Sequence, residues 1–204
     1  DEIKTRPDML AIDTRDAIVS CFAQGSQAEE IAGWKQLQNW DTTIPVVFRS
    51  MAQRKTVRMC EHQQRPYFYI DTGYIGNLNK KKHWHRVVPN GMQHSQPRFD
   101  LPADRFDKCI DSQDIRFKGW KKNGSAILLV TPSGKPCSFY GIDRDVWIEE
   151  TVAEIKKHTD REVIVRNKGL RRDRVRSHSI YSQFEEDNIF AVVTYNSIAA
   201  TEAI

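Results

Sequence analysis

The chain has 204 residues, of which 39% are hydrophobic and 28% are charged, and its formal net charge is +4. This length is sufficient for one large or two small domains with a buried core. No apolar run approaches the roughly 20 residues of a membrane-spanning helix, and the N-terminal residues lack the pattern of a signal peptide. These features predict an intracellular globular protein without a membrane partner.

The four cysteines indicate neither a disulfide framework nor a metal site. They lie far apart, at positions 21, 60, 109 and 137, and no Cys-x-x-Cys pair is present. This spacing predicts reduced thiols in or near the core. His83 and His85 flank Trp84 without a third ligand at a usable spacing, so we expect no bound metal.

The first half of the chain alternates apolar runs with helical patterns. Apolar runs predict strands at 9–12, 46–48 and 67–70. The spacing of the intervening residues predicts helices at 17–22, 27–39 and 49–60. This alternation is typical of a parallel sheet with helices on both faces. From Asn77 to Lys118 the pattern weakens, which predicts a loop-rich segment with one strand at Arg86–Val88.

A second unit is built around the most apolar strand of the chain. Residues 127–130 show no polar alternation, so both faces of this strand should be covered, as in the centre of a parallel sheet. A helix capped by Asp143 or Asp145 follows. The apolar stripe of this helix consists of Ile148, Val152 and Ile155. Two further strands are predicted at 162–166 and 189–194.

We therefore predict an α/β fold of two Rossmann-like parallel-sheet units, residues 1–118 and 119–204. A final helix is predicted to begin at Asn196 and to continue to the last residue, Ile204, without a capping glycine or proline. The second unit is thus expected to be truncated.

The carboxyl end of the central strand carries a turn with hydroxyl groups and a cation. This turn, Thr131-Pro-Ser-Gly-Lys135, supplies Ser133 and Lys135 at the edge where open α/β sheets bind ligands. The pattern favours a phosphate-bearing ligand, although the spacing is not that of a Walker loop. An ordinary connection between strand and helix is the alternative.

Basic residues crowd the segment that ends and follows the next strand: Arg166, Lys168, Arg171, Arg172, Arg174 and Arg176. A guanidinium can donate two hydrogen bonds at once to the oxygens of a phosphate. Arg166 and Lys168 are expected at the carboxyl end of the strand, which is the edge of the sheet where ligands bind. A solvated loop or nucleic-acid contacts explain the later arginines equally well. Asn196 and Ser197 are predicted to begin a helix, where free backbone amides favour a bound anion. Glu202, further along this helix, could accept hydrogen bonds from ribose hydroxyls, and an ordinary surface position is the alternative.

Candidate acid–base residues lie in the first unit. Asp71 ends a strand and precedes Gly73, and a carboxylate there could take a proton from a hydroxyl, as could His83 or His85. The alternative is that Asp71 caps the turn and that the histidines lie on an exposed loop.

The segment between these residues mixes basic and aromatic side chains. Lys81, Lys82 and Trp84 could bind the backbone of a nucleic acid and stack on its bases. An ordinary surface cluster is the alternative.

Short segments from about Ile12 onward carry a family resemblance: Tyr69-Ile-Asp-Thr-Gly-Tyr-Ile-Gly76, His85-Arg-Val-Val-Pro-Asn90, Ile127-Leu-Leu-Val-Thr-Pro-Ser133, the helix from Trp147, Thr159-Asp-Arg161, Val163-Ile-Val-Arg-Asn-Lys168 and Val192-Val-Thr-Tyr-Asn-Ser197. In these segments the chain resembles bacteriophage-encoded, glycosyltransferase-like proteins and, more loosely, the two-domain GT-B class of sugar-nucleotide transferases. The resemblance implies two Rossmann-like domains that face a cleft, an acceptor side at 1–118, a nucleotide-sugar donor side at 119–204, and a location in the host-cell cytoplasm.

The resemblance also implies roles for the donor-side residues. Ser133 and Lys135 would lie near the donor phosphates. Arg166 and Lys168 would neutralise the leaving diphosphate. Ser197 would bind phosphate at the start of its helix.

Glu202 would hold the ribose, and Asp71 or His85 would be the base for the acceptor hydroxyl. Such enzymes generally need no metal and no other cofactor, because cations and helix dipoles stabilise the leaving group. The family pattern continues with Gly-x-Pro and further elements, which this sequence lacks after Ile204.

Two functions follow from these observations. The first is a glycosyltransferase that moves a sugar from a nucleotide-sugar to a hydroxyl, for which modified DNA bases are an acceptor that suits the basic segments. The second is a nonenzymatic phage protein that uses the same fold and charge to bind a nucleic acid or a protein partner.

Overall fold

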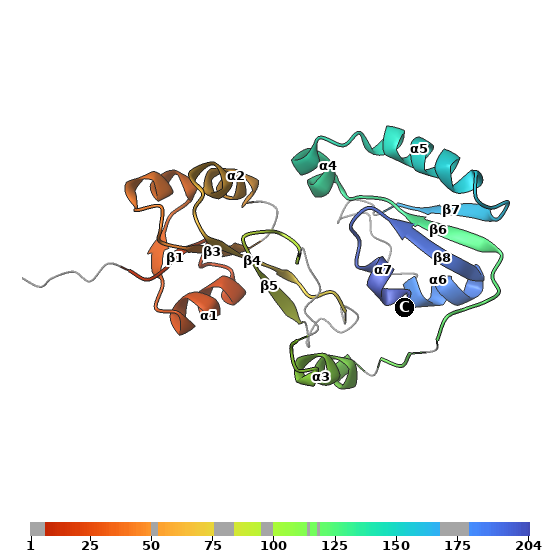
Figure 1. Cartoon of the computed structure of the whole chain (residues 1–204), viewed down its shortest axis with the longest axis horizontal. Coiled ribbons are helices and arrows are strands. Elements are labelled where there is room, and N and C mark those ends of the chain that lie inside the picture. Colours follow the sequence, from red (N-terminus) through yellow and green to blue (C-terminus); the bar gives the residue numbers. More distant parts are fainter. Residues whose placement is uncertain are drawn as a thin grey trace, which may run out of the picture. The chain divides into compact units, whose positions relative to one another are not determined.

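The computed structural model describes residues 7–49, 53–75, 84–94, 100–113, 115–117, 119–167 and 180–204. It divides the chain into two compact units, Asp1–Gln113 and Asp114–Ile204. Each unit contains one β-sheet with helices packed on it (Figure 1). The α/β class predicted from the alternation of apolar runs and helical patterns is therefore confirmed, and each unit is described by itself.

The first unit is a five-stranded sheet in the order β2-β1-β3-β4-β5. Its elements are β1 (Leu10–Ile12), α1 (Ala17–Gly25), β2 (Glu29–Ile31), the 3-10 helix η1 (Trp34–Asn39), β3 (Val46–Arg49), α2 (Arg54–Gln63), β4 (Tyr67–Thr72), β5 (His85–Pro89) and α3 (Asp104–Gln113). The first four strands are parallel, whereas β5 pairs with β4 in the antiparallel direction. The prediction of an all-parallel sheet is wrong at this edge, because β5 runs antiparallel to β4, with Tyr69 opposite Val88 and Thr72 opposite His85.

A second difference concerns residues 27–39, which were predicted to form one helix. Glu29–Ile31 instead pairs with β1 as an edge strand, and only Trp34–Asn39 is helical, as a 3-10 helix. The spacing of Trp34 and Leu37 fits the three-residue turn of that helix. A strand of three residues with a single buried side chain, Ile31, is too short to show a period of two.

The helix α3 lies inside the segment that was predicted to be loop-rich. Most of its side chains are exposed, and Cys109 is its one buried residue in the part of the helix for which burial is described. An apolar stripe is the main signal of a helix in a sequence, and this helix has almost none.

The two faces of the first sheet are packed differently. Helix α1 covers one face, where Val19 and Ala23 contact Ala11, Val47 and Ile70 of the strands. Helix α2 covers the other face (Figure 1). On that side Phe48 stacks on Tyr67 and meets Tyr69 edge-on, with ring centroids 5.6 and 6.1 Å apart. Successive side chains of a strand point to opposite faces of the sheet. The faces on which the apolar residues are buried therefore fix the faces of the polar residues at the strand ends.

The second unit is a three-stranded parallel sheet in the order β7-β6-β8. Its elements are β6 (Ala126–Val130), α4 (Gly134–Tyr140), α5 (Arg144–Lys156), β7 (Glu162–Arg166), α6 (Ile180–Glu186), β8 (Ile189–Thr194) and α7 (Ala199–Glu202). All five residues of β6 are buried and β6 is the central strand, as predicted. Helices α4 and α6 were not predicted, and both are only seven residues long.

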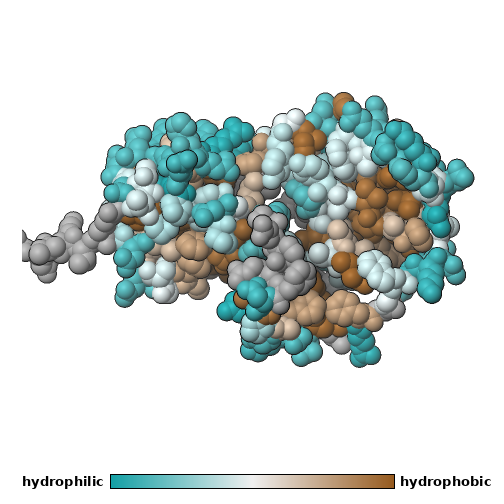
Figure 2. All heavy atoms as spheres, in the orientation of Figure 1, coloured by the Kyte–Doolittle hydropathy of each residue, from teal (hydrophilic) through white to brown (hydrophobic). Residues whose placement is uncertain are grey.

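Helix α5 is confirmed, with Asp143 as its cap. The Asp143 carboxylate accepts hydrogen bonds from the backbone amides of Asp145 and Val146, at 3.0 and 3.3 Å. The predicted apolar stripe is only half-buried. Figure 2 shows hydrophilic residues gathered over the outer side of this helix. Among the residues that the structure describes, no helix has both the length and the apolar character needed to cross a membrane.

The four thiols are free, and the prediction that they lie in or near the core is confirmed for Cys60 and Cys109 and wrong for Cys21. Cys60 and Cys109 are buried, Cys137 is half-buried and Cys21 is exposed. Burial raises the pKa of the Cys60 thiol to about 12, so this cysteine is protonated at neutral pH and unsuited to nucleophilic chemistry.

Candidate functional site

The strand order of both sheets creates a point where ligands commonly bind. In each sheet the first strand of the unit lies between the second and the third. The chain leaves the first strand toward one side and later returns to the other side, and in open α/β sheets ligands bind at such a point, at the carboxyl ends of the first and third strands. This point lies between β1 and β3 in the first unit, and between β6 and β8 in the second.

At this point of the first unit, Asp16, Arg49 and His85 form a polar cluster on the face that α1 covers. Arg49 ends β3, and its Nη1 donates to Asp16 Oδ2 at 2.5 Å. The Nη2 atom of Arg49 lies 3.2 Å from His85 Nε2. A guanidinium can only donate, so Nε2 must be the acceptor and the imidazole must be neutral in this contact.

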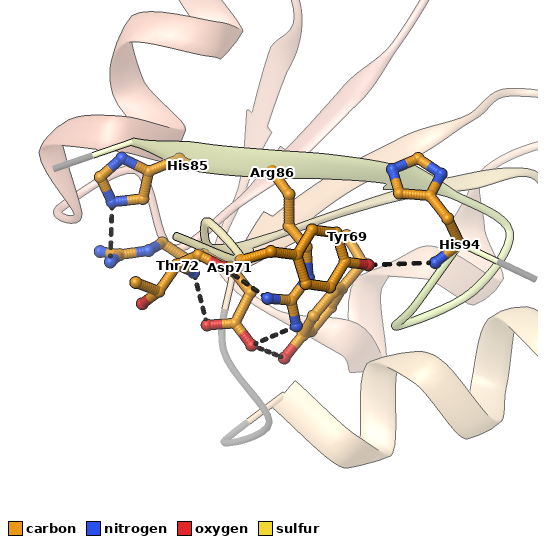
Figure 3. A network of polar contacts seen from close by, with 8 residues as sticks. Tyr69, Asp71, Thr72, His85, Arg86 and His94 are labelled. Carbon is orange, nitrogen blue, oxygen red and sulfur yellow. Dashed lines mark hydrogen bonds and ion pairs between the residues drawn. The ribbon is translucent and has the colours of Figure 1, made fainter. Parts of the chain in front are cut away.

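A second polar cluster surrounds Asp71 on the opposite face (Figure 3). Asp71 Oδ2 accepts a hydrogen bond from the hydroxyl of Tyr69 at 3.0 Å and lies 3.4 Å from Nη2 of Arg86. Asp71 Oδ1 accepts from the backbone amide of Thr72 at 2.8 Å. The guanidinium of Arg86 also lies over the ring of Tyr74, 4.7 Å from its centroid. Both carboxylate oxygens of Asp71 are therefore engaged in contacts within the unit.

The strand register separates the two predicted bases. Thr72 pairs with His85, and Asp71 pairs with Arg86, across the antiparallel strands β4 and β5. Directly paired residues share a face, and neighbours along a strand point to opposite faces. Asp71 and His85 consequently point to opposite sides of the sheet. They belong to two clusters and do not form one acid–base pair.

Asp16 has two structural roles that can be separated by mutation. It caps α1 by accepting from the amide of Ile18 at 3.0 Å, and it pairs with Arg49. Burial alone would raise the pKa of Asp16, but the hydrogen bonds from Arg49 and Ile18 outweigh it and hold the pKa below its usual value. A depressed pKa in the folded state means that this contribution to stability is present above the unfolded-state pKa and is lost as the pH falls through the folded-state pKa.

We expect Asp16→Ala to lower the free energy of unfolding by about 1–2 kcal/mol at pH 7, because both the cap and the ion pair are lost. Asp16→Asn keeps a capping oxygen and removes only the charge, so its loss should be smaller. Urea unfolding of both variants at several pH values measures these effects. The difference in free energy of unfolding between wild type and Asp16→Asn should become smaller below about pH 4, where the carboxylate is protonated. A difference that stays constant to lower pH would contradict the ion pair.

In the second unit the structure brings the predicted residues to one edge of the sheet. Thr131, Asn167 and Tyr195 directly follow β6, β7 and β8, and they lie at this edge because the three strands are parallel. Thr131 is only 2% exposed, and its hydroxyl donates to the side chain of Asn167 at 3.1 Å. The hydroxyl of Thr194 donates to the carbonyl of Val130 at 2.9 Å. These hydrogen bonds tie the three strand ends together.

The residues predicted to bind phosphate leave this edge on both faces of the sheet. Ser133 precedes α4, on the side of the sheet that carries α5, and its side chain makes no capping hydrogen bond to the helix. Lys135, in the first turn of α4, is exposed. Ser197 precedes α7 on the other side, and its hydroxyl accepts from the amide of Ala199 at 3.2 Å.

Arg166 ends β7 and points toward α6. Its Nη1 donates to Oε1 of Gln183, and the Gln183 amide donates in turn to Asp187 at 2.9 Å. Glu202 lies near the same helix, since burial and the charge of Glu202 together raise the pKa of Tyr181 to about 12. Arg166 and Glu202 thus lie on the α6 side of the sheet, whereas Lys135 lies on the α4 side. Asn196 is exposed in the segment after β8.

The remaining predicted contacts are described only in part. Lys81, Lys82, His83, Lys168, Arg171, Arg172 and Arg174 lie outside the described residues. Trp84 is half-buried, and its indole NH donates to the hydroxyl of Ser112 at 2.9 Å. This hydrogen bond joins α3 to the residue that precedes β5. Nucleic-acid stacking by Trp84 remains a prediction. In the described parts of the chain, no group of three or more histidine, cysteine or acidic side chains could hold a metal ion.

Several polar residues at these edges were missed by the sequence analysis. Arg49 contacts the candidate His85, Arg86 contacts the candidate Asp71, and Asp16 pairs with Arg49. Arg49 directly follows the predicted strand 46–48, so its position at a strand end was a usable signal. The pairing of Arg86 with Asp71 depends on the antiparallel return of β5, for which the sequence offered no signal.

The fold is that of an α/β protein with polar side chains at the strand-end edge of each sheet. Comparisons with protein-family models, with curated protein sequences and with solved structures found no match to the chain.

Proposed function

We propose that the second unit binds the diphosphate of a nucleotide-sugar and that the chain is a metal-independent glycosyltransferase. The sugar would move to a hydroxyl acceptor presented by the first unit, as the sequence resemblance to phage glycosyltransferase-like proteins implies. The observation that carries the proposal is the crossing point between β6 and β8, where two polar loops leave adjacent parallel strands. Ligands of open α/β sheets bind at such points.

The charges of the described residues at this edge suit a diphosphate. Lys135 provides an exposed ammonium after β6, and Arg166 provides a half-buried guanidinium at the end of β7. A departing nucleoside diphosphate develops negative charge, and fixed cations near it stabilise the transition state. Arg166 is held by Gln183, so its position is set before a ligand arrives.

Of the two predicted bases, His85 fits the role better. Both oxygens of Asp71 already accept hydrogen bonds from Tyr69 and Thr72 and contact Arg86. His85 presents a ring nitrogen that must be unprotonated in its contact with Arg49. In the proposed reaction, release of the Arg49 contact would allow this nitrogen to take the proton of the acceptor hydroxyl.

We expect Arg166→Ala to weaken the binding of nucleoside diphosphates about 10- to 100-fold, because it removes a charge-assisted hydrogen bond to phosphate. Isothermal titration calorimetry of wild type and variant gives the two dissociation constants. Lys157→Ala removes an exposed cation at the far end of α5 and is the matched control. Equal affinities of wild type and Arg166→Ala would contradict the donor-site assignment.

The test of function itself uses a panel of nucleotides, nucleotide-sugars and DNA in thermal unfolding. Ligands that bind the folded protein raise its Tm, so nucleotides and nucleotide-sugars should do so. If DNA alone raises the Tm, and the effect decreases steeply with salt, the protein is a nucleic-acid-binding protein and the transferase proposal fails.

A further inference from the structure

Four aromatic side chains form a cluster at the carboxyl edge of the second unit. Phe139 and Tyr140 come from the end of α4, Trp147 comes from α5, and Tyr195 directly follows β8. The ring of Tyr195 lies 5.8 Å from that of Tyr140 and 6.3 Å from that of Trp147, measured between centroids. Phe139 and Tyr140 are 4.9 Å apart. We call these four residues the aromatic shelf.

Two of the four residues of the shelf are exposed, and Phe139 and Trp147 are half-buried. Tyr195 is 41% exposed and Tyr140 is 45% exposed. Every ring pair meets edge to face, with interplanar angles of 74°, 66° and 84°. Edge-to-face contacts of this kind fix the orientation of each ring relative to its neighbour. The shelf therefore presents aromatic surface that is held in place by its neighbours.

The chain connects the shelf to both polar loops of the proposed phosphate site. Tyr195 is followed directly by Asn196 and Ser197. Helix α4 starts one residue after Ser133 and ends at Tyr140, and its seven residues span about 10 Å. One end of this helix thus lies at the phosphate loop and the other end at the shelf, a separation on the scale of a nucleoside.

We infer that the aromatic shelf stacks on the nucleobase of the nucleotide whose phosphates bind between β6 and β8. This inference rests on the proposed function, because the phosphate loops determine which ligand reaches the shelf. Stacking on an aromatic side chain accepts any base, since every base has an apolar face. The shelf consequently contributes affinity for nucleotides in general, and selection among bases is left to other contacts.

The test compares ligands with and without a base on matched variants. Wild type, Tyr195→Ala and Tyr195→Phe are titrated with UDP, with ADP and with inorganic pyrophosphate. Wild type should bind both nucleotides more tightly than pyrophosphate, by about 5- to 150-fold. Tyr195→Ala should lose most of this preference and keep its affinity for pyrophosphate, whereas Tyr195→Phe keeps the ring and should keep the preference. Binding of a nucleotide to wild type should also change the fluorescence of Trp147, with Trp147→Phe as the control.

The outcomes separate the shelf from the donor site. If wild type prefers nucleotides and Tyr195→Ala retains the full preference, the shelf does not stack on the nucleobase, and the proposed donor site is not contradicted. If Tyr195→Ala weakens binding of a UDP-sugar but not of UDP, the shelf contacts the sugar, and the nucleobase assignment is wrong. If wild type binds neither the nucleotides nor pyrophosphate, the shelf and the proposed function both fail. Circular dichroism of each variant verifies that it is folded.

Discussion

Replacement of Arg65 by methionine is expected to lower the free energy of unfolding of the first unit by about 4 kcal/mol. Arg65 is only 2% exposed and lies between α2 and β4. Its guanidinium donates to four backbone carbonyls at 2.8–2.9 Å, those of Leu37, Trp40, Asp41 and Ile44. Leu37 belongs to η1, and the other three residues lie in the connection between η1 and β3. Methionine preserves the apolar stem, so the expected loss comes from carbonyls that are left without a donor.

The control for this substitution is Arg15→Met, the same chemical change at an exposed position. The Arg15 side chain is 94% exposed and pairs with Asp13 at 3.3 Å, so its loss should change stability by less than about 0.5 kcal/mol. Hydrogen exchange of the β3 amides reports the stability of the first unit, and that of the β6 amides serves as an internal reference. If Arg65→Met exchanges as slowly as Arg15→Met, the carbonyls are satisfied in another way and Arg65 is not a structural clamp.

The second large effect is expected at Gly124, where alanine should destabilise the second unit by about 3 kcal/mol. A Cβ atom at this position would lie 2.6–2.7 Å from two backbone atoms of Phe190, N and Cα, and from its side-chain Cβ. Backbone atoms cannot move aside as a flexible side chain can. The pairing of β6 with β8 shifts by one residue here, since Ala126 pairs with Ile189 and Ile127 pairs with Ala191. Phe190 is thus the extra residue of a β-bulge, and glycine accommodates it.

Gly134→Ala is the matched control, because a Cβ atom at Gly134 meets no other residue within 4 Å. Gly134 is the first residue of α4, where alanine is at least as favourable as glycine. Urea unfolding followed by exchange of the β6 amides should therefore show a loss for Gly124→Ala and no loss for Gly134→Ala. Equal stabilities of the two variants would show that the bulge can relax and that the close approach is not needed.

Buried strands were the elements that the sequence predicted best. Residues 126–130 and 46–48 are continuous apolar runs, and burial on both faces of a sheet is what such runs require. The edge strand β2 and helices α3, α4 and α6 were missed because they expose most of their residues or are too short to show a period. The direction of β5 was also missed, since pairing direction depends on the length of the return and leaves no trace in the apolar pattern of a five-residue strand.

The sequence predicted which residues reach the edge of the sheet, because that depends on where strands end. It did not predict on which face of the sheet each residue lies. Ser133, Arg166 and Ser197 reach one edge of the second sheet because they end or follow parallel strands, which the sequence indicated. Their distribution over the α4 and α6 sides follows from the helices that start there, two of which were not predicted. Likewise, the placement of Asp71 and His85 on opposite faces depends on the register of β4 and β5, which is a property of the folded sheet.

Hydrogen exchange with and without saturating UDP is the most direct test of nucleotide binding at the edge of the second sheet. The backbone amides at 133–135 and 195–198 should exchange more slowly with UDP, because both loops lie where the phosphates are proposed to bind. Arg166→Ala should reduce this protection at a fixed UDP concentration. No change at either loop, or protection confined to residues of the first unit, would contradict a donor site between β6 and β8.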